Sequence, residues 1–209
     1  IHQRLEVLSA LSEAGIQQPL VISSVTAILQ KTIAKDSLIS MQHTLHQGDK
    51  IKLQEVLSRW SQMGYQFEST VYIPGHASLR GGIVDVFPVG SKEPVRIELW
   101  GDEITSMRFF DPETQRSTGA VNSVSLWPAS ETLPRLTQPD EMKCSINSLD
   151  FTNCTTMNQQ RMVEELNLLI DGYEVDDVQF YSGFFNYGSL LDYFPDNTLL
   201  VLHNPVKIN

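Results

Sequence analysis

The side chains with the clearest chemical pattern lie between residues 95 and 100, where apolar and polar residues alternate. Successive side chains of a β-strand point to opposite faces, so a strand here would carry Arg96, Glu98 and Trp100 in a row on one face. A guanidinium gives directional hydrogen bonds, and a tryptophan ring contributes a large contact area at a small entropy cost. The pattern is typical of a protein-binding surface that suits carboxylates and an apolar patch on a partner.

On the residues alone, a structural role for the same residues is favoured over binding. Trp100 could pack beneath a loop, and Arg96 could pair with Glu98 or with a residue of a neighbouring strand. Such cross-strand pairs are common in sheets, and for an isolated Arg-x-Glu-x-Trp pattern they are the more frequent explanation. On the residues alone, this face is therefore a candidate surface.

No arrangement for catalysis accompanies it. Hydrolysis of a nucleotide needs a glycine loop followed by Lys and Ser or Thr, whereas Gly48-Asp49-Lys50 places a carboxylate where a phosphate would lie. The five histidines are scattered, and the two cysteines lack metal-ligand spacing. Adjacent carboxylates such as Asp102 and Glu103 point apart on a strand or turn. We expect no catalytic residue, metal or cofactor in this chain.

Length, composition and charge restrict the kinds of protein that this chain can be. With 209 residues, 41% of them hydrophobic, the chain can form one or two domains with cores of their own. Carboxylates dominate residues 140–196, and a surface rich in them repels the phosphates of DNA, so we expect poor DNA binding. The chain opens at Ile1 and has no apolar run near the roughly 20 residues that span a bilayer. We interpret it as a soluble, cytoplasmic piece of a longer protein.

Residues 1–36 have the pattern of half an α/β unit. Leucines at helical spacing predict a helix over 5–11, and the short apolar run 19–22 predicts a buried strand. Ser23 or Ser24 can cap a following helix. Because an isolated strand needs partners, the rest of its sheet must come from elsewhere.

Residues 131–209 offer those partners. A helix is predicted near 159–170, and short apolar runs predict strands at 178–181 and 198–202. We therefore predict that 1–36 and 131–209 together form one α/β domain that is split by an insertion.

The middle of the chain, residues 37–130, predicts that insertion. An apolar stripe marks a helix over 50–63, which Asp49 can cap and Gly64 can end. Short alternating segments follow without intervening helices, which favours an antiparallel sheet packed on the helix, hence an α+β domain. Gly101-Asp102 forms a tight hairpin. The predicted strands are residues 67–73, 83–87, 95–100, 104–110 and 121–127.

Several segments in a fixed order resemble one family. The runs 80–88, 94–104 and 110–117 closely resemble the UvrB-homology module of bacterial transcription-repair coupling factors, with support from 21–30 and 193–201. The resemblance implies a degenerate helicase-like α/β domain that has lost its nucleotide loop and is split by an inserted domain that binds the excision-repair protein UvrA.

The same resemblance implies site residues and partners. The UvrA-contacting residues carry over as Arg80, Arg96 and Trp100, and less directly Glu98. The family often has Phe where Trp100 stands, which keeps the aromatic group but changes its shape. The implied role is to recruit UvrA to a stalled RNA polymerase. ATP, magnesium, DNA and the polymerase would be bound by other parts of a parent protein that is an ATP-dependent DNA translocase.

Two alternatives stay open. The chain could be part of UvrB itself, a damage-verifying ATPase component, although no aromatic-rich hairpin suited to separating DNA strands is found. It could also be a structural module that supports or masks motor domains of the parent, which is compatible with UvrA binding.

Overall fold

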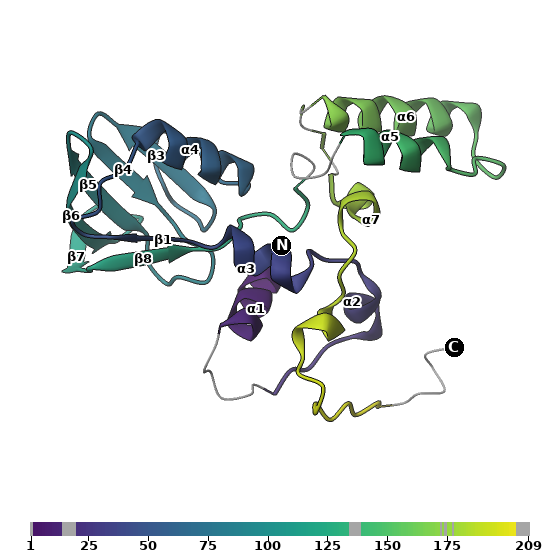
Figure 1. The fold of residues 1–209 in the computed structure, drawn as a ribbon, viewed down its shortest axis with the longest axis horizontal. Helices are drawn as coiled ribbons and strands as arrows, with labels where there is room; N and C mark the ends of the chain where they lie inside the picture. Colours follow the sequence, from purple (N-terminus) through teal and green to yellow (C-terminus); the bar gives the residue numbers. More distant parts are fainter. Residues whose placement is uncertain are drawn as a thin grey trace.

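The computed structural model shows a mixed α/β chain with two sheets (Figure 1). A curved sheet with helix α4 occupies one end, the helical pair α5 and α6 the other, and α1, α2, α3 and α7 lie between them. The residues that the structure describes are 2–13, 20–133, 139–171, 173, 175–176 and 178–203.

The helices and strands have the following bounds. The helices are α1 (His2–Ser12), α2 (Val25–Leu29), α3 (Lys35–Met41), α4 (Leu53–Gln62), α5 (Pro139–Asn147), α6 (Thr156–Ile170), α7 (Ser182–Phe185) and the 3-10 helices η2 (Val178–Tyr181) and η3 (Leu190–Tyr193). The strands are β1 (His43–His46), β2 (Gln66–Phe67), β3 (His76–Arg80), β4 (Ile83–Val86), β5 (Val95–Trp100), β6 (Glu103–Phe110), β7 (Ser117–Ala120) and β8 (Ser123–Leu126).

The larger sheet has six strands in the order in which they occur along the chain, from β2 to β7. Every pair is antiparallel except β2 and β3, which run parallel. Strands β1 and β8 form a separate antiparallel pair. The prediction of consecutive antiparallel strands is confirmed, and β5 has the predicted bounds. Strands β3 and β7 were not predicted, and the strand expected over 67–73 shortens to two residues.

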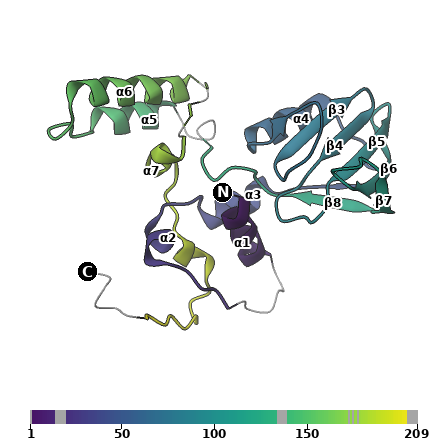
Figure 2. The same ribbon diagram turned by 180° about the vertical axis from the view of Figure 1, so that it is seen from behind.

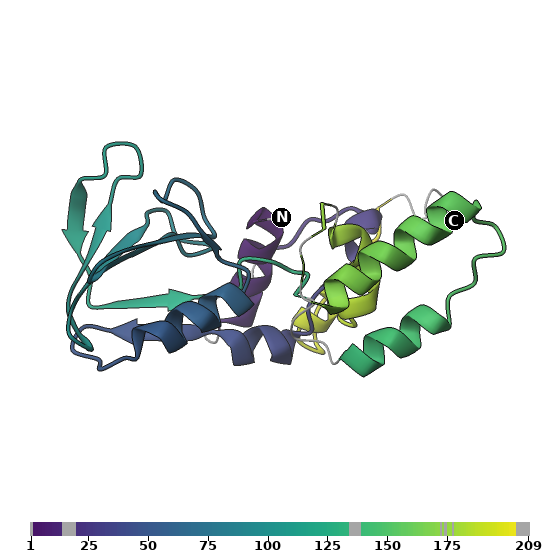
Figure 3. The same cartoon turned by 90° about the horizontal axis from the view of Figure 1, so that it is seen from above.

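Helix α4 covers one face of the sheet (Figure 3). Its apolar stripe buries Val56 and Trp60 among the inward side chains of the strands, as an amphipathic helix does. Gly64 ends the helix with a φ of +88°. The predicted cap was wrong: Asp49 accepts a hydrogen bond from the backbone N–H of His46 at 2.7 Å, and the helix begins later, after Lys52.

Segments from both halves of the chain lie side by side between the sheet and the helical pair (Figure 2), and polar contacts join them. The buried carboxylate of Glu131 accepts hydrogen bonds from Arg4 Nε at 2.8 Å and from Thr32 Oγ1 at 2.7 Å. Thr32 also forms a two-way backbone bridge with Gly188. The hydroxyl of Tyr193 donates to the carbonyl of Ile33 at 2.8 Å. These bonds hold the N-terminal and C-terminal segments together.

Three predicted strands were wrong. The described residues 20–22 and 198–202 have no strand partner, and 178–181 form η2; residue 19 lies outside the described residues. An apolar run becomes a strand only when neighbouring strands satisfy its backbone groups, and no such neighbours lie beside these runs in the described residues. The parallel sheet expected from 1–36 and 131–209 is therefore absent from the described part of the chain.

The helical pair α5 and α6 has a core of its own, separate from the core under the sheet. Leu166 and Leu169 of α6 pack against Met142 and Ile146 of α5, and Tyr181 and Phe185 complete the cluster. The prediction of a helix near 159–170 is confirmed, whereas α5 was missed because its sequence is mostly polar.

Candidate protein-binding site

The face of the sheet opposite α4 carries the polar residues that the sequence singled out. Pairing places Arg80 beside Ile83, Glu98 and Ser106 in one row, and Asp85, Arg96 and Arg108 in the next. We call this surface the arginine face, made up of Arg80, Asp85, Arg96, Glu98, Trp100, Ser106 and Arg108. Strand alternation alone brings these residues from four strands to one side of the sheet.

Asp85 is the centre of the arginine face. Its side chain is 1% exposed and lies between two arginines on the flanking strands. Arg96 donates from Nε to Oδ1 at 2.7 Å and from Nη2 to Oδ2 at 2.9 Å, a bidentate pairing. Arg80 donates from Nη2 to Oδ2. A buried carboxylate without partners is strongly unfavourable, so these two cations are what allow Asp85 to be charged inside the sheet.

Arg96 is mostly enclosed by its neighbours. Its guanidinium lies 4.7 Å from the centroid of the Phe110 ring, and Nη1 donates to the carbonyl of Gln115 at 3.4 Å. Hydrogen bonding to Asp85 raises the pKa of Arg96 above its already high ordinary value. With 17% of its side chain exposed, Arg96 has little surface left for a partner.

A small apolar cluster supports the enclosed end of the arginine face. Val71, Phe87 and Phe110 pack together there, apart from the main core. The turn after β6 closes over them: Gln115 adopts a φ of +59° and its side chain donates to the carbonyl of Val71 at 3.3 Å. Asp111 holds the same turn by accepting three hydrogen bonds. The residues that pack against Arg96 are therefore held in place within the chain itself.

Glu98 and Arg108 form a second, more open pair. Arg108 donates to Oε1 of Glu98, and the hydroxyl of Ser106 donates to Oε2 at 2.7 Å. Both oxygens of Glu98 are thus engaged within the sheet. The structural alternative for the polar pattern is in part confirmed, because Arg96 and Glu98 each pair with a neighbouring strand, although not with each other.

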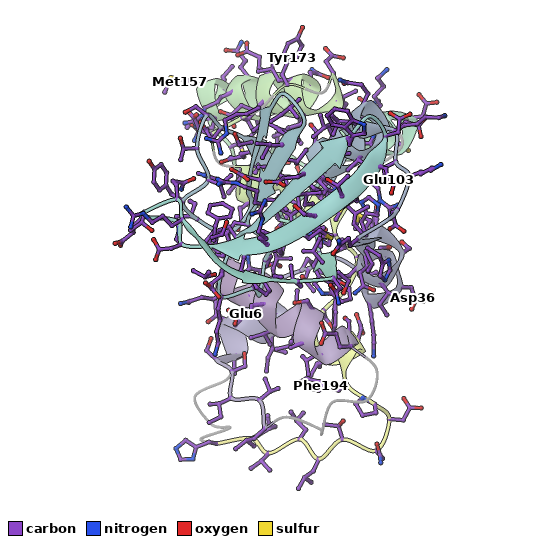
Figure 4. The ribbon with its side chains drawn as sticks, turned by 90° about the vertical axis from the view of Figure 1, so that its left-hand side faces the viewer. Glu6, Asp36, Glu103, Met157, Tyr173 and Phe194 are labelled. Atoms are coloured by element: carbon purple, nitrogen blue, oxygen red, sulfur yellow. The ribbon has the colours of Figure 1, made fainter. Side chains whose placement is uncertain are left out.

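Trp100 lies at the open end, where β5 turns into β6. Its side chain is 84% exposed, so the alternative in which it packs beneath a loop was wrong. Gly101, with a φ of +62°, makes the turn, and Trp100 pairs with Glu103 across it. Figure 4 shows Glu103 near the rim of the sheet. An exposed tryptophan on a rigid hairpin is a common anchor of protein interfaces.

Arg80 is placed by the hairpin between β3 and β4. Gly81 has a φ of +62°, and a side chain on Gly82 would lie 2.9 Å from the carbonyl oxygen of Leu99. Both glycines are therefore needed for this close turn, and Arg80 ends the strand before it with 48% of its side chain exposed.

The four predicted site residues thus share one face, but in different ways. Arg80 and Trp100 are accessible, Glu98 is half-buried, and Arg96 is mostly enclosed. Sequence reasoning missed Asp85, although a lone carboxylate between Val84 and Val86 was a visible signal. It also missed Ser106 and Arg108, and no signal in the sequence separates these from ordinary strand residues.

Within the described residues, no group of three or more His, Cys, Asp or Glu is placed to hold a metal ion. No helix among the same residues is both long and apolar enough to cross a membrane.

The region that carries the arginine face matches a known family. Residues 44–131 match the model of the UvrB interaction domain. This match defines the class of the sheet and α4: they form an interaction domain of the UvrB type. The match includes all eight strands except the first residue of β1.

Similar proteins extend the match to the whole chain. Transcription-repair-coupling factors of Bacillus subtilis (strain 168) and Myxococcus xanthus are 31% and 29% identical, each over 99% of this chain. That of Staphylococcus haemolyticus (strain JCSC1435) is 47% identical over 43% of this chain and 8% of its own length. The chain belongs to the transcription-repair coupling factor family. It spans 18% of the Bacillus and Myxococcus proteins.

Proposed function

We propose that this chain binds UvrA through the arginine face and takes no part in catalysis itself. The observation that carries the proposal is the placement of two accessible groups, the half-exposed Arg80 and the exposed Trp100, on one face of a UvrB-type interaction domain. A directional cation and an aromatic anchor on a rigid sheet are the features of a protein-binding hot spot. Arg96 and Glu98 complete the site.

Membership of the coupling factor family supports a proposal for the role of this binding. We propose that the chain recruits UvrA, and with it the excision machinery, to a stalled RNA polymerase. Contacts with the polymerase and DNA, and any ATP or magnesium, would belong to other parts of a parent protein that moves along DNA. The acidic balance of the chain supports this division, because carboxylates oppose binding to phosphates. A cytoplasmic location goes with this role.

The finer fold assignment is part of the proposal. We propose that residues 1–36 and 131–209 belong to one degenerate helicase-like α/β domain and that 37–130 is inserted into it. Support comes from the junction, where Arg4 and Thr32 of the N-terminal segment bind Glu131. Residues that precede and follow the sheet domain are thereby held together.

The alternative, that the chain is part of UvrB, rests on the family model alone. The curated relatives that cover 99% of the chain carry the name of the coupling factor, and they favour the first assignment.

Calorimetric binding of purified UvrA tests the proposal. Trp100→Ala should weaken binding by about 2 kcal/mol or more, the size expected at an interface hot spot. Arg96→Ala should weaken binding by a similar amount through loss of the pairing with Asp85, because Arg96 itself has little surface left for a partner. Arg59→Ala and Tyr72→Ala remove an arginine and an aromatic residue at exposed positions outside the arginine face and should change little. Circular dichroism confirms that each variant is folded. Equal affinity of a folded double variant and the wild type would refute this site.

A further inference from the structure

The arginine face carries more positive than negative charge, and the excess positive charge can be assigned to one residue. Three arginines face two carboxylates, Asp85 and Glu98. Arg108 and Glu98 form a one-to-one pair, whereas Asp85 is shared by Arg80 and Arg96. The shared carboxylate leaves one positive charge in excess. Because Arg96 is bound in a bidentate manner and enclosed by Phe110, the accessible part of that charge lies on Arg80.

Asp85 also fixes where that charge lies. Its Oδ2 accepts from Arg80 and from Arg96 at once, so the carboxylate ties the end of β3 to the middle of β5. Arg96 is in turn held by the carbonyl of Gln115. A long arginine side chain at a strand end would otherwise sample many rotamers, and ordering it on binding costs free energy.

We propose that Asp85 is the positioning residue of the arginine face: it makes no contact with the partner, but holds Arg80 in the orientation that receives a partner carboxylate. This inference rests on the proposed binding of UvrA. The guanidinium of Arg80 donates to Asp85 from Nη2, and 48% of the side chain stays exposed, so its other N–H groups can receive the two oxygens of a carboxylate. The nearly inaccessible position of Asp85 excludes a direct contact.

Recognition by charge and recognition by the orientation of Arg80 predict opposite effects of Asp85→Asn on UvrA binding. Replacing Asp85 by Asn removes a negative charge and makes the arginine face more positive. If an acidic partner were recognised by charge alone, Asp85→Asn would therefore bind faster and more tightly. If orientation of Arg80 decides, the variant dissociates faster, because a freed arginine must be ordered again in each complex.

The first experiment measures association and dissociation rates of UvrA with Asp85→Asn by surface plasmon resonance. We expect a rise in the dissociation rate of about fivefold or more, with an association rate that is unchanged or higher. Glu68→Gln is the matched control: it removes an exposed carboxylate that forms no hydrogen bond with Arg80 or Arg96 in the described structure. The control should keep the wild-type dissociation rate. Binding by Asp85→Asn as tight as wild type, or tighter, overturns the proposal.

Coupling between the residues separates positioning from a general loss of structure. In an Arg80→Ala background, Asp85→Asn should raise the dissociation rate much less than it does beside Arg80, since the side chain that it positions is gone. Equal effects in both backgrounds would mean that Asp85 acts through Arg96 or through the fold, and not through Arg80, and would overturn the proposal.

The mobility of the Arg80 side chain can also be measured in the wild-type chain, so this test does not depend on whether a variant folds. Side-chain ¹⁵N relaxation by NMR should show the Arg80 Nε–H as rigid as that of Arg96 and clearly more rigid than that of Arg116, which is exposed. Mobility equal to Arg116 contradicts the inference even if UvrA binds. Absence of UvrA binding by a rigid wild-type chain would instead refute the proposed function, so the two failures are distinguishable.

Discussion

The sheet domain and the two ends of the chain use similar apolar runs with opposite results. In the sheet, strands β4, β5 and β6 pair with one another, with one shift of register between β5 and β6 after Glu98, and bury their apolar side chains under α4. In the ends, Leu20 is 90% exposed and Leu199 is 85% exposed, in segments with no strand partner among the described residues. The difference shows that β-propensity specifies a strand only where partner strands are present.

The difference in stability between the two regions should be largest at the centre of the sheet domain. Trp60 is fully buried between α4 and the sheet, and Trp60→Ala should lower the free energy of unfolding by about 3–5 kcal/mol through loss of burial and an unfilled cavity. Leu199→Ala, which truncates an exposed side chain, should change it by less than about 0.5 kcal/mol. Urea denaturation of both variants measures the difference. Similar losses would mean that residues 198–202 are packed in solution.

The junction between the regions gives the next largest effect. Glu131→Gln weakens the pairing with Arg4 and should cost about 1–3 kcal/mol, since the buried groups lose a charged partner. Hydrogen exchange should become faster at Thr32 and Gly188, whose backbones form the bridge beside Glu131. Strands β4 to β6 should keep their protection. Equal loosening of the sheet would show that the two regions unfold as one unit.

An effect of similar size is expected at the end of α4. Gly64 has a φ of +88°, and an added Cβ would lie 2.8 Å from Cβ of Ser130, at the exit of the sheet domain. Gly64→Ala should therefore cost about 1–2 kcal/mol from the left-handed backbone conformation and more from the clash. Gly48→Ala shares the positive φ but has open space around it, and the excess loss at Gly64 measures the clash alone.

The smallest expected effect is a pH dependence of the turn under Arg96. Hydrogen bonds from the backbone N–H and hydroxyl of Thr114, and from Glu113, lower the pKa of Asp111 below its ordinary 3.8. A lowered folded-state pKa contributes stability above pH 3.8, and the contribution is lost as pH falls through the lowered value. Asp111→Asn should flatten the fall of unfolding free energy below pH 3.8. An unchanged slope would exclude a role for Asp111.

The same contrast explains what the sequence could predict. The alternation of apolar and polar residues predicted both ends of β5 correctly and placed Arg96, Glu98 and Trp100 on one face, because strand geometry is local. It could not show that Asp85 pairs with both arginines, since these contacts depend on register across three strands. Nor could it show that residues 20–22 and 198–202 lack partners, because pairing is decided outside the run itself. Helix α5 was missed because its buried side chains, Met142 and Ile146, are few.

The most direct test of the account is calorimetric titration of UvrA into the wild-type chain and into Arg96→Ala/Trp100→Ala, with folding of both checked by circular dichroism. The account predicts binding by the wild-type chain and loss of binding by the folded variant. A folded variant that binds as tightly as the wild-type chain would contradict the assignment of the arginine face as the UvrA site.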